Sequence, residues 1–379
     1  MALDAFDVSL GRHWMSSLVH HTKGLWRWLG NVETKVLADE LSDVEVEAPI
    51  YIAGLARSGS TILLRVVSSH PDVVTHQYRD FPFIYIPFWW QQTLDRSVKG
   101  ELEPAERAHK DRLKVTPNSP EAMEEVLWMA FFSGLHDPSQ SNVLDADTDN
   151  PAFEQFYREH IEKLLFVREG RRYAAKGNYN VSRFEYLLEL FPDARFVIPV
   201  RQPRTHIASS RKQHRLFCEG ATDNDRAIAH LERVGHYEFG PHRRPVNLGD
   251  GETVREIEGL WEKGEEVRGW ARYWAYLYGF LADRLESNPK LRDATTLVRY
   301  EDLCDETGPE LEKLTAHCGI DDRTDDIVDR FRDSISRPDY YEADFTDAEE
   351  DAITEETEET AARFGYQGGD VQPDFPLER

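Results

Sequence analysis

Three parts of the chain share one pattern, in which an apolar run is followed by a loop and then by a helical stretch. The apolar runs cover residues 49–54, 172–176 and 195–201, and the helical stretches cover residues 61–69, 181–190 and 203 to about 215. Short apolar runs rich in β-branched residues indicate buried strands. Strands that alternate with helices form a parallel sheet that is covered on both faces. The pattern therefore predicts an α/β fold with a parallel sheet flanked by helices.

The rest of the chain is mostly helical in pattern, and no linker divides it into two domains. Helical stretches cover residues 121–132 and 153–167, a long aromatic helix holds Trp261, Trp270, Trp274 and Tyr278, and a last strand at 295–300 leads into a helix at 310–318. Residues 238–252, rich in Gly, Pro and charge, form either a lid or an insertion. We expect one domain with helical insertions over residues 49–340, an N-terminal helical segment at 1–48 and an acidic C-terminal segment at 341–379.

Composition excludes several classes of protein. No run approaches the roughly eighteen apolar residues of a membrane span, and the acidic N-terminus does not resemble a secretory signal, so we expect a cytoplasmic protein. Cys218, Cys304 and Cys318 are far apart and form no C-x-x-C pair, which argues against a disulfide framework and a zinc site. The net charge of −25 would repel nucleic acid. An anionic ligand must therefore find a local basic pocket.

The acidic residues also indicate a habitat. Arginine greatly outnumbers lysine, and acids crowd into segments such as 321–326 and 349–359. This composition resembles that of proteins from salt-loving organisms, in which concentrated salt screens the repulsion between like charges. The alternative is an ordinary acidic protein with a solvated C-terminal face. We favour the halophilic interpretation.

A glycine-bearing loop follows the first strand and leads directly into a helix. It reads Gly54-Leu-Ala-Arg-Ser-Gly59-Ser60-Thr61. In such an arrangement the loop amides and the helix N-terminus converge on a phosphate. The spacing is that of the P-loop of nucleoside-triphosphate enzymes, but Ser60 stands where that motif has lysine. The basic residue comes earlier, at Arg57, so nucleoside triphosphate hydrolysis is disfavoured.

The loop and its helix resemble a motif of the sulfotransferase family. Residues 54–65, followed by Ser69-His70-Pro71, are similar to the 5′-phosphosulfate loop of enzymes that use 3′-phosphoadenosine 5′-phosphosulfate (PAPS). The resemblance implies a P-loop-like sheet. It also assigns a set of residues to the 5′ side of the donor: Arg57, Ser58, Gly59, Ser60 and Thr61. The transfer of a sulfonate group from PAPS, which the resemblance implies, requires no metal.

The third strand resembles the 3′-phosphate site of the same family. Its apolar run ends at Arg201, and Ser209 lies on the helix that follows. A guanidinium group offers a planar fork that suits a dianionic phosphate. The resemblance therefore implies that Arg201 and Ser209 bind the 3′-phosphate of PAPS.

Two further segments complete the resemblance. Residues 175–180, followed by Leu190-Phe-Pro192, are similar to a segment of tyrosylprotein and related bacterial sulfotransferases, which implies a catalytic role for Lys176. Lys176 ends a predicted parallel strand, and ligands bind at that edge of such sheets. Residues 297–303 resemble the late strand of the family and imply that Tyr300 lies near the nucleotide.

The resemblance implies in-line transfer of a sulfonate group to an acceptor hydroxyl. Fixed positive charge stabilises the leaving nucleotide in such a reaction, and Arg57 and Lys176 would supply it. A general base must accept the hydroxyl proton. Related enzymes carry it shortly after the second strand, where this chain has no glutamate, so we expect Asp80 first and His76 second. The alternative for Asp80 is a structural role, in which it pairs with Arg79 or caps a helix.

Other functions and partners fit parts of this pattern. The chain could be a nucleotide-dependent kinase with a drifted P-loop, or a non-catalytic nucleotide-binding protein. No motif specifies the acceptor, so glycan, glycolipid, small metabolite and protein tyrosine are all candidates. Residues 10–37 combine tryptophans with basic side chains, as an interfacial helix does. This segment either contacts a membrane surface or packs on the domain or on a second copy in a homodimer, and its glycines at 11, 24 and 30 favour packing.

Overall fold

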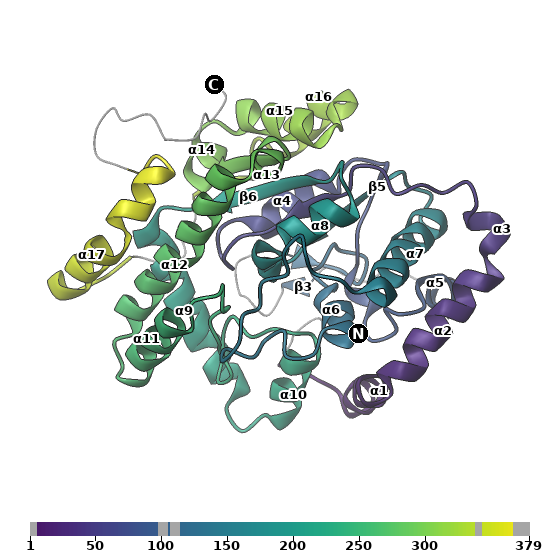
Figure 1. Ribbon diagram of the computed structural model, residues 1–379, viewed down its shortest axis with the longest axis horizontal. Helices are drawn as coiled ribbons and strands as arrows, with labels where there is room; N and C mark the ends of the chain where they lie inside the picture. Colours follow the sequence, from purple (N-terminus) through teal and green to yellow (C-terminus); the bar gives the residue numbers. More distant parts are fainter. Residues whose placement is uncertain (1–5, 98–104, 107–113, 338–342, 367–379) are drawn as a thin grey trace.

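A sheet of five parallel strands forms the centre of the molecule, in the order β2-β5-β1-β6-β7. The computed structural model describes residues 6–97, 105–106, 114–337 and 343–366. The five strands are β1 (Ile50–Ile52), β2 (Val73–Val74), β5 (Arg172–Lys176), β6 (Arg195–Val200) and β7 (Thr295–Arg299). Helices cover both faces of the sheet (Figure 1). The predicted parallel α/β fold is confirmed.

Alternate residues of the strands point into two separate apolar cores. Tyr51 of β1 and Phe196 of β6 face the larger core, whereas Ile52 and Val197 face the smaller one. Strands that are buried on both faces read as continuous apolar runs. The smaller core is covered by α4 (Ser60–Val67), α15 (Thr307–Cys318) and α16 (Thr324–Phe331). The larger core is covered by α7 (Pro151–Val167), α8 (Phe184–Leu190), α9 (Pro203–Ala221) and α12 (Glu266–Ser287).

The remaining elements lie around this three-layer body. The helices are α1 (Leu10–His21), α2 (Lys23–Val36), α3 (Ala38–Leu41), α5 (Pro87–Ser97), α6 (Glu125–Phe131), α10 (Asp225–Arg233), α11 (Gly251–Glu262), α13 (Pro289–Asp293), α14 (Tyr300–Asp305) and α17 (Asp347–Arg363). Short 3₁₀ turns are η1 (Tyr78–Asp80), η2 (Asn178–Ser182) and η3 (Asp321–Arg323). β3 (Ala105–Glu106) and β4 (Lys114–Val115) pair antiparallel, apart from the main sheet.

The long aromatic helix that the sequence predicts is two helices. Trp261 lies near the end of α11, and Trp270 lies in α12. Gly264 has a φ of +81° between them, and glycine in this left-handed conformation commonly ends a helix. The two indole rings still meet, with centroids 5.1 Å apart. The shared aromatic pattern thus reflects a contact between α11 and α12.

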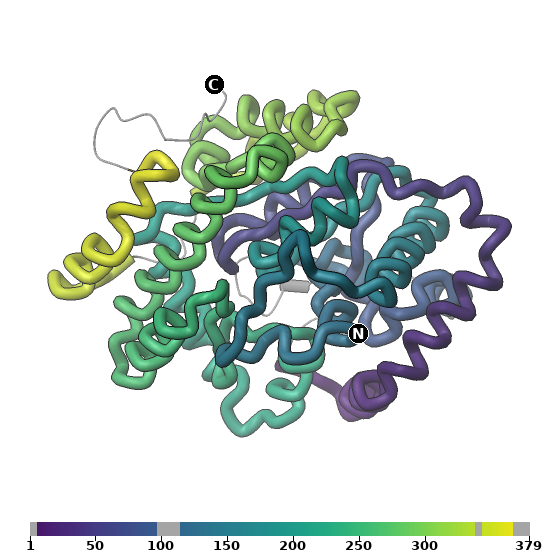
Figure 2. The backbone as a smooth tube through the Cα atoms, viewed as in Figure 1, coloured from purple at the N-terminus to yellow at the C-terminus, as the bar shows by residue number. Residues whose placement is uncertain are grey.

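The two ends of the described chain form helices on opposite sides of the molecule. Figure 2 shows α1 to α3 in purple along one side and α17 in yellow at the other. α17 packs against α12, and its Ile353 and Ala361 belong to the larger core.

The N-terminal helices pack on the body of the protein at Gly30. This residue of α2 is buried so tightly that a Cβ atom there would lie 2.6 Å from the carbonyl oxygen of Tyr85. Among the helices described, none is long and apolar enough to cross a bilayer.

Candidate functional site

The residues that the sequence assigns to the donor site lie at the carboxyl edge of the sheet. Lys176 ends β5 beside Ile52 of β1, which leads into the glycine loop. Arg201 follows Val200 of β6, which pairs with Arg299 of β7, immediately before Tyr300. Lys176 and Arg201 therefore lie on opposite sides of β1. Ligands of parallel sheets bind at this edge.

The loop between β1 and α4 has an unusual backbone at two positions. Gly59 forms the N-cap of α4 with a φ of +108°, and a Cβ atom there would lie 2.8 Å from Cδ2 of Tyr300. Arg57 has a φ of +77°, which is uncommon for a residue with a side chain and costs about 1–3 kcal/mol. Such strain gathers at binding sites. The amides of Gly59 and Ser60 at the helix start donate no hydrogen bond to another described residue.

Two arginines and a serine come together beside this loop. Arg57 Nε donates to Ser209 Oγ at 3.3 Å, and Arg201 Nη1 donates to the carbonyl oxygen of Arg57 at 3.2 Å. The Arg201 guanidinium lies over the Tyr300 ring, 4.7 Å from its centroid. Arg201 and Ser209 are both buried. The structure therefore joins Arg57, expected at the 5′ side of the donor, to Ser209, expected at its 3′ side.

A histidine that sequence reasoning missed holds the loop in place. His206 of α9 lies with Nε2 2.9 Å from the carbonyl oxygen of Ala56. Burial is the main reason that the pKa of His206 falls to about 3, and the charges of Arg201 and Arg57 contribute to the same shift. The neutral ring donates this hydrogen bond. Two of the charges that contribute to this shift, on Arg201 and Arg57, belong to the site, which is therefore locally basic in a strongly acidic protein.

Asp80 lies in a buried ion pair. Its Oδ1 accepts from Arg168 Nη2 at 2.6 Å, and its Oδ2 lies 3.0 Å from His76 Nδ1 and 2.9 Å from the Gln77 amide nitrogen. Burial would raise the pKa of Asp80, but the hydrogen bond from His76 and the charge of Arg168 outweigh it and hold this pKa at about 2. Asp80 also completes a capping box with Gln77 in η1. This environment favours the capping role, because a carboxylate of such low pKa is a weak base.

His76, the second expected base, belongs to the same buried cluster. Its Nε2 lies 3.2 Å from His160 Nε2, and its ring meets Tyr173 edge to face. The predicted pairing of Asp80 with Arg79 is replaced by the pairing with Arg168, 88 residues away. As bases, Asp80 and His76 stay predictions, and the structure surrounds both with protein partners.

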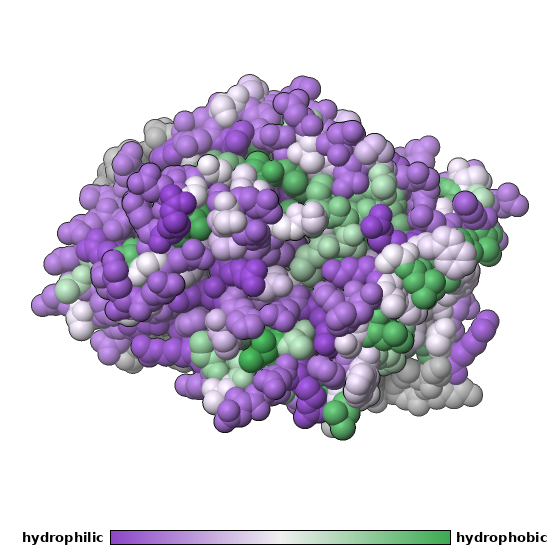
Figure 3. Space-filling view, turned by 60° about the horizontal axis from the view of Figure 1, so that its bottom comes forward, coloured by the Kyte–Doolittle hydropathy of each residue, from purple (hydrophilic) through white to green (hydrophobic). Residues whose placement is uncertain are grey.

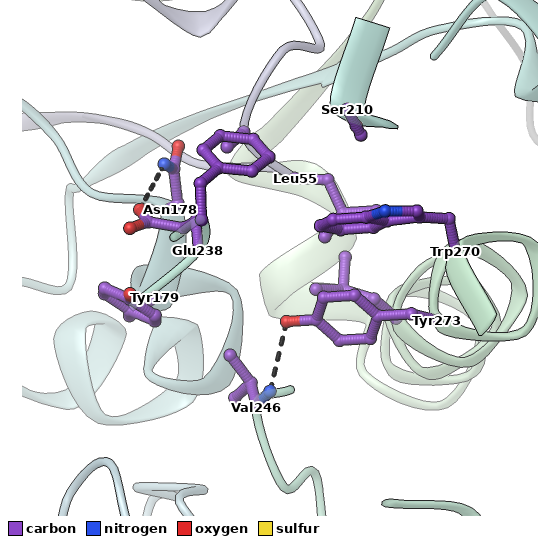
Figure 4. A pocket seen from close by; sticks show the side chains of 11 residues that line it. Leu55, Asn178, Tyr179, Ser210, Glu238, Val246, Trp270 and Tyr273 are labelled. Carbon is purple, nitrogen blue, oxygen red and sulfur yellow. Dashed lines mark hydrogen bonds between the residues drawn. The ribbon is translucent and has the colours of Figure 1, made fainter. Parts of the chain in front are cut away.

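A cavity lies next to the donor residues, and sequence reasoning missed it. It is narrow, with about 20 Å³ of free space, which is room for about one water molecule. Its walls include Leu55 and Ala56 of the glycine loop, Asn178 after β5, and Glu238 from the loop between α10 and α11. Figure 4 shows Asn178 and Glu238 on one side of the cavity and the rings of Trp270 and Tyr273 on the other. The predicted loop at 238–252 thus forms part of this wall.

Comparison with known proteins agrees with this geometry. The model of the sulfotransferase family matches residues 49–244, which contain the glycine loop, Lys176 and Arg201. No curated protein matches the chain. A sulfotransferase structure from Mycobacterium avium aligns over 88% of this chain and 82% of its own, with a TM-score of 0.50 and 14% identity, which shows a shared fold. A second sulfotransferase structure, from Mycobacterium tuberculosis, covers 86% of this chain and 81% of its own, with a TM-score of 0.43 and 15% identity.

These matches decide between the functions that the sequence left open. The family match spans more than half of the chain, and the parallel sheet is that of a sulfotransferase. The family match argues against a nucleotide-dependent kinase with a drifted P-loop and against a non-catalytic nucleotide-binding protein. The chain belongs to the sulfotransferase family and is an enzyme that transfers sulfonate groups to hydroxyl-bearing acceptors.

Proposed function

We propose that the sulfonate donor is PAPS and that it binds at the carboxyl edge of the sheet. The contact between Arg57, Ser209 and Arg201 is the observation that carries this proposal. PAPS carries phosphate at both its 5′ and 3′ positions, and this cluster joins the loop expected at the first to the helix expected at the second. A guanidinium group can bind a phosphate through two parallel hydrogen bonds. A nucleotide with two phosphorylated positions therefore suits a cluster that brings two arginines together.

Each residue of the site has a distinct role in this proposal. The Gly59 and Ser60 amides, with Ser58, Thr61 and the Arg57 side chain, would hold the 5′-phosphosulfate. Arg201 and Ser209 would bind the 3′-phosphate, with Tyr300 packed against the Arg201 guanidinium.

Transfer itself depends on charge at the bridging oxygen. The acceptor oxygen attacks sulfur while the bond from sulfur to the 5′-phosphate breaks, so negative charge grows on the leaving phosphate. Lys176 ends β5, and Arg57 lies in the loop that follows the adjacent strand β1. Both would stabilise that charge.

Ligand binding tests this proposal before any acceptor is known. Adenosine 3′,5′-bisphosphate should raise the melting temperature of the protein, because a ligand that binds only the folded state stabilises it. ATP with magnesium is the matched control, since it lacks the 3′-phosphate. Stabilisation by ATP alone would overturn the assignment of PAPS.

We further propose that the enzyme works at the surface of a membrane. The exposed large hydrophobic side chains of the described chain all lie on α1 and α2: Leu10, Trp14, Met15, Leu18, Leu25, Trp28 and Val36. Figure 3 shows hydrophobic side chains on the side of the molecule where these helices lie. Exposed apolar patches mark interaction sites. The basic residues Arg12, Lys23, Arg27 and Lys35 on the same helices would attract anionic lipid.

The surface charge supports a proposal of adaptation to salt. Arginines of several helices pair with acids of α17, among them Arg204 with Glu350 and Arg268 with both Glu355 and Glu356. These ion pairs neutralise only part of the acidic surface, because the net charge of the chain is −25. Salt screens self-repulsion of this kind. A melting temperature that rises with potassium chloride up to molar concentrations would support a halophilic origin, and a falling one would contradict it.

A further inference from the structure

The loop between β1 and α4 contains a tight turn over residues 55–58. The Ser58 amide donates to the carbonyl oxygen of Leu55 at 3.2 Å, which closes the turn. Within it, φ is positive at Arg57 but not at Ala56. These signs are those of a type II turn, whose third position favours glycine. Arginine is strained at that position, so the turn needs a contact that holds it in this form.

A type I turn is the relaxed alternative for the same four residues. It can keep the same closing hydrogen bond, but its third residue has a negative φ, which arginine adopts without strain. The two forms differ in the peptide group between Ala56 and Arg57, which is turned over in one relative to the other. Because this group is planar and trans, its N–H points away from its C=O. The direction of the Ala56 carbonyl group therefore distinguishes the two forms.

The positive φ at Arg57 also begins a longer backbone pattern. Over residues 57–60 the sign of φ alternates, because it is positive at Arg57 and Gly59 but not at Ser58 or at Ser60, where α4 begins. Successive amides in backbone of this kind form a concave site for anions. If Arg57 relaxed to a negative φ, its amide would turn away from the concave side and a carbonyl oxygen would take its place. That oxygen would repel a phosphosulfate.

His206 of α9 fixes the direction of the Ala56 carbonyl group. Its Nε2 lies 2.9 Å from that oxygen. Burial lowers the pKa of His206 to about 3, so the ring is neutral and carries one proton. A carbonyl oxygen only accepts hydrogen bonds, which places this proton on Nε2. The side chain is 1% exposed, so water does not compete for the contact.

The next carbonyl group of the turn is held by the same strand-helix unit. Arg201 follows β6 and donates from Nη1 to the carbonyl oxygen of Arg57 at 3.2 Å. His206 lies five residues later, near the start of α9. Two consecutive carbonyl oxygens of the turn thus accept from the unit that is expected to bind the 3′-phosphate. The form of the 5′ loop depends on this unit.

We propose that His206 is a positioning residue that selects the anion-binding form of the loop. It acts through the peptide group between Ala56 and Arg57. This inference rests on the proposed use of PAPS, because the loop is expected to hold the 5′ end of that donor. Without the hydrogen bond, strain at Arg57 would favour the type I turn by about 5- to 100-fold. The apparent affinity for the donor would fall by the same factor, because only the anion-binding form is competent.

Two substitutions of similar length test the hydrogen bond. His206→Met removes the proton donor, whereas the side-chain amide in His206→Gln reaches the place of Nε2 and restores it. In calorimetric titration, His206→Met should weaken the binding of adenosine 3′,5′-bisphosphate and adenosine 5′-monophosphate by about 5- to 100-fold. Adenosine 3′-monophosphate, which lacks the 5′-phosphate, should lose much less. His206→Gln should bind all three nucleotides nearly as wild type does. An equal loss for all three in His206→Met, or no rescue in His206→Gln, would contradict the proposal.

His230→Met is the matched control. His230 is also a buried histidine, but it lies on α10, where its ring meets Phe81 edge to face. This substitution removes a buried imidazole without touching the loop, so the affinities for the three nucleotides should be those of wild type. If His230→Met weakened the bisphosphate as much as His206→Met does, the loss would not come from the turn.

Urea unfolding tests the turn without any donor. Arg57→Gly and Arg57→Ala both remove the guanidinium group, but only glycine adopts a positive φ without strain. With His206 present, Arg57→Gly should therefore have the higher urea midpoint. Combined with His206→Met, where the turn has relaxed, this order should vanish or reverse, because glycine loses more conformational freedom on folding. The same difference in both backgrounds would show that His206 does not select the turn.

The two experiments separate the role of His206 from the choice of donor. If adenosine 3′,5′-bisphosphate does not bind wild type, the assignment of PAPS fails, and the unfolding experiment still decides whether His206 selects the turn. If the bisphosphate binds wild type and His206→Met with equal affinity, the assignment of PAPS stands and the proposed role of His206 is wrong.

Discussion

The Nε atom of Arg57 lies 3.3 Å from the Oγ atom of Ser209, although 152 residues separate them along the chain. This contact ties the loop after β1 to α9. Arg201 strengthens the link, because it donates to the carbonyl oxygen of Arg57. The three residues act as one unit, so removal of any of them should disturb the others. Effects of such coupled substitutions are not additive.

Arg201→Lys should weaken the binding of adenosine 3′,5′-bisphosphate by about tenfold or more. Lysine keeps the charge but loses the planar fork that lies over Tyr300 and reaches the Arg57 carbonyl oxygen. Binding of adenosine 5′-monophosphate, which lacks the 3′-phosphate, should change much less. Calorimetric titration with both nucleotides measures the difference.

Arg226→Lys is the control for this substitution. Arg226 is exposed on α10, so the exchange should leave both affinities unchanged. An equal loss of affinity for the two nucleotides in Arg201→Lys would place Arg201 away from the 3′-phosphate.

Gly59→Ala should both destabilise the protein and abolish donor binding. Two effects add here: a φ of +108°, and a Cβ atom 2.8 Å from Cδ2 of Tyr300. Gly249→Ala separates them, because Gly249 has a φ of +103° but no atom within 4 Å of its Cβ position. The Gly249 variant should lose only the cost of backbone strain, about 1–3 kcal/mol of unfolding free energy. If urea unfolding gives both variants the same loss, the contact with Tyr300 is unimportant.

The sequence predicts the donor site better than the cavity beside it, for a physical reason. The glycine loop and Arg201 belong to strand-loop-helix units, in which a local pattern fixes the position of each residue at the sheet edge. Glu238 lies in a loop without periodicity, and its place depends on contacts with Tyr179 and α12 that no local pattern encodes. Sequence reasoning could have marked residue 238 only as the one acid near the start of a Gly/Pro-rich loop.

Asp80 illustrates the same limit. Its neighbour Arg79 was the obvious partner in sequence, but Arg168, from the end of α7, occupies that place. The separation of 88 residues hid the ion pair. The prediction of one long aromatic helix was wrong for a different reason: two helices that pack together gave one continuous aromatic pattern in the sequence. Contacts between elements, not the elements themselves, are what escaped prediction.

Asp80→Asn should lower the free energy of unfolding by about 2 kcal/mol at neutral pH. The pKa of Asp80 is about 2 in the folded protein, against an ordinary value of 3.8, and a tenfold change in proton affinity corresponds to about 1.4 kcal/mol. Because the folded pKa is depressed, this stability is present above pH 3.8 and is lost as the pH falls through 2. Wild type and variant should therefore converge between these values in urea unfolding.

Asp147→Asn is the control, because Asp147 is exposed in a turn. The same Asp80 variant separates its two roles. If Asp80 has the capping role, the folded variant keeps the turnover of wild type in an acceptor screen with labelled PAPS. Loss of turnover with unchanged stability would instead identify Asp80 as the general base.

Replacing the exposed apolar side chains of α1 and α2 should abolish membrane binding without unfolding the protein. Trp14, Leu18 and Trp28 are 72%, 60% and 58% exposed, so changing all three to Gln should alter stability little. Wild type should float with vesicles of anionic lipid at low salt and less with zwitterionic vesicles, whereas the triple variant should stay at the bottom of the gradient. The reason is that apolar burial and attraction of basic residues to anionic lipid act together.

A charge-matched pair of variants isolates the electrostatic part of this binding. Lys23→Gln with Lys35→Gln removes two charges from the apolar helices, and Lys263→Gln with Lys290→Gln removes two charges from elsewhere on the surface. Only the first pair should weaken flotation, because attraction to the lipid surface falls off within about 10 Å at 0.1 M salt. A second copy of the chain is the competing occupant of the apolar face. It would be favoured if the Trp14, Leu18 and Trp28 variant halved the molecular mass in solution while wild type failed to float on either kind of vesicle.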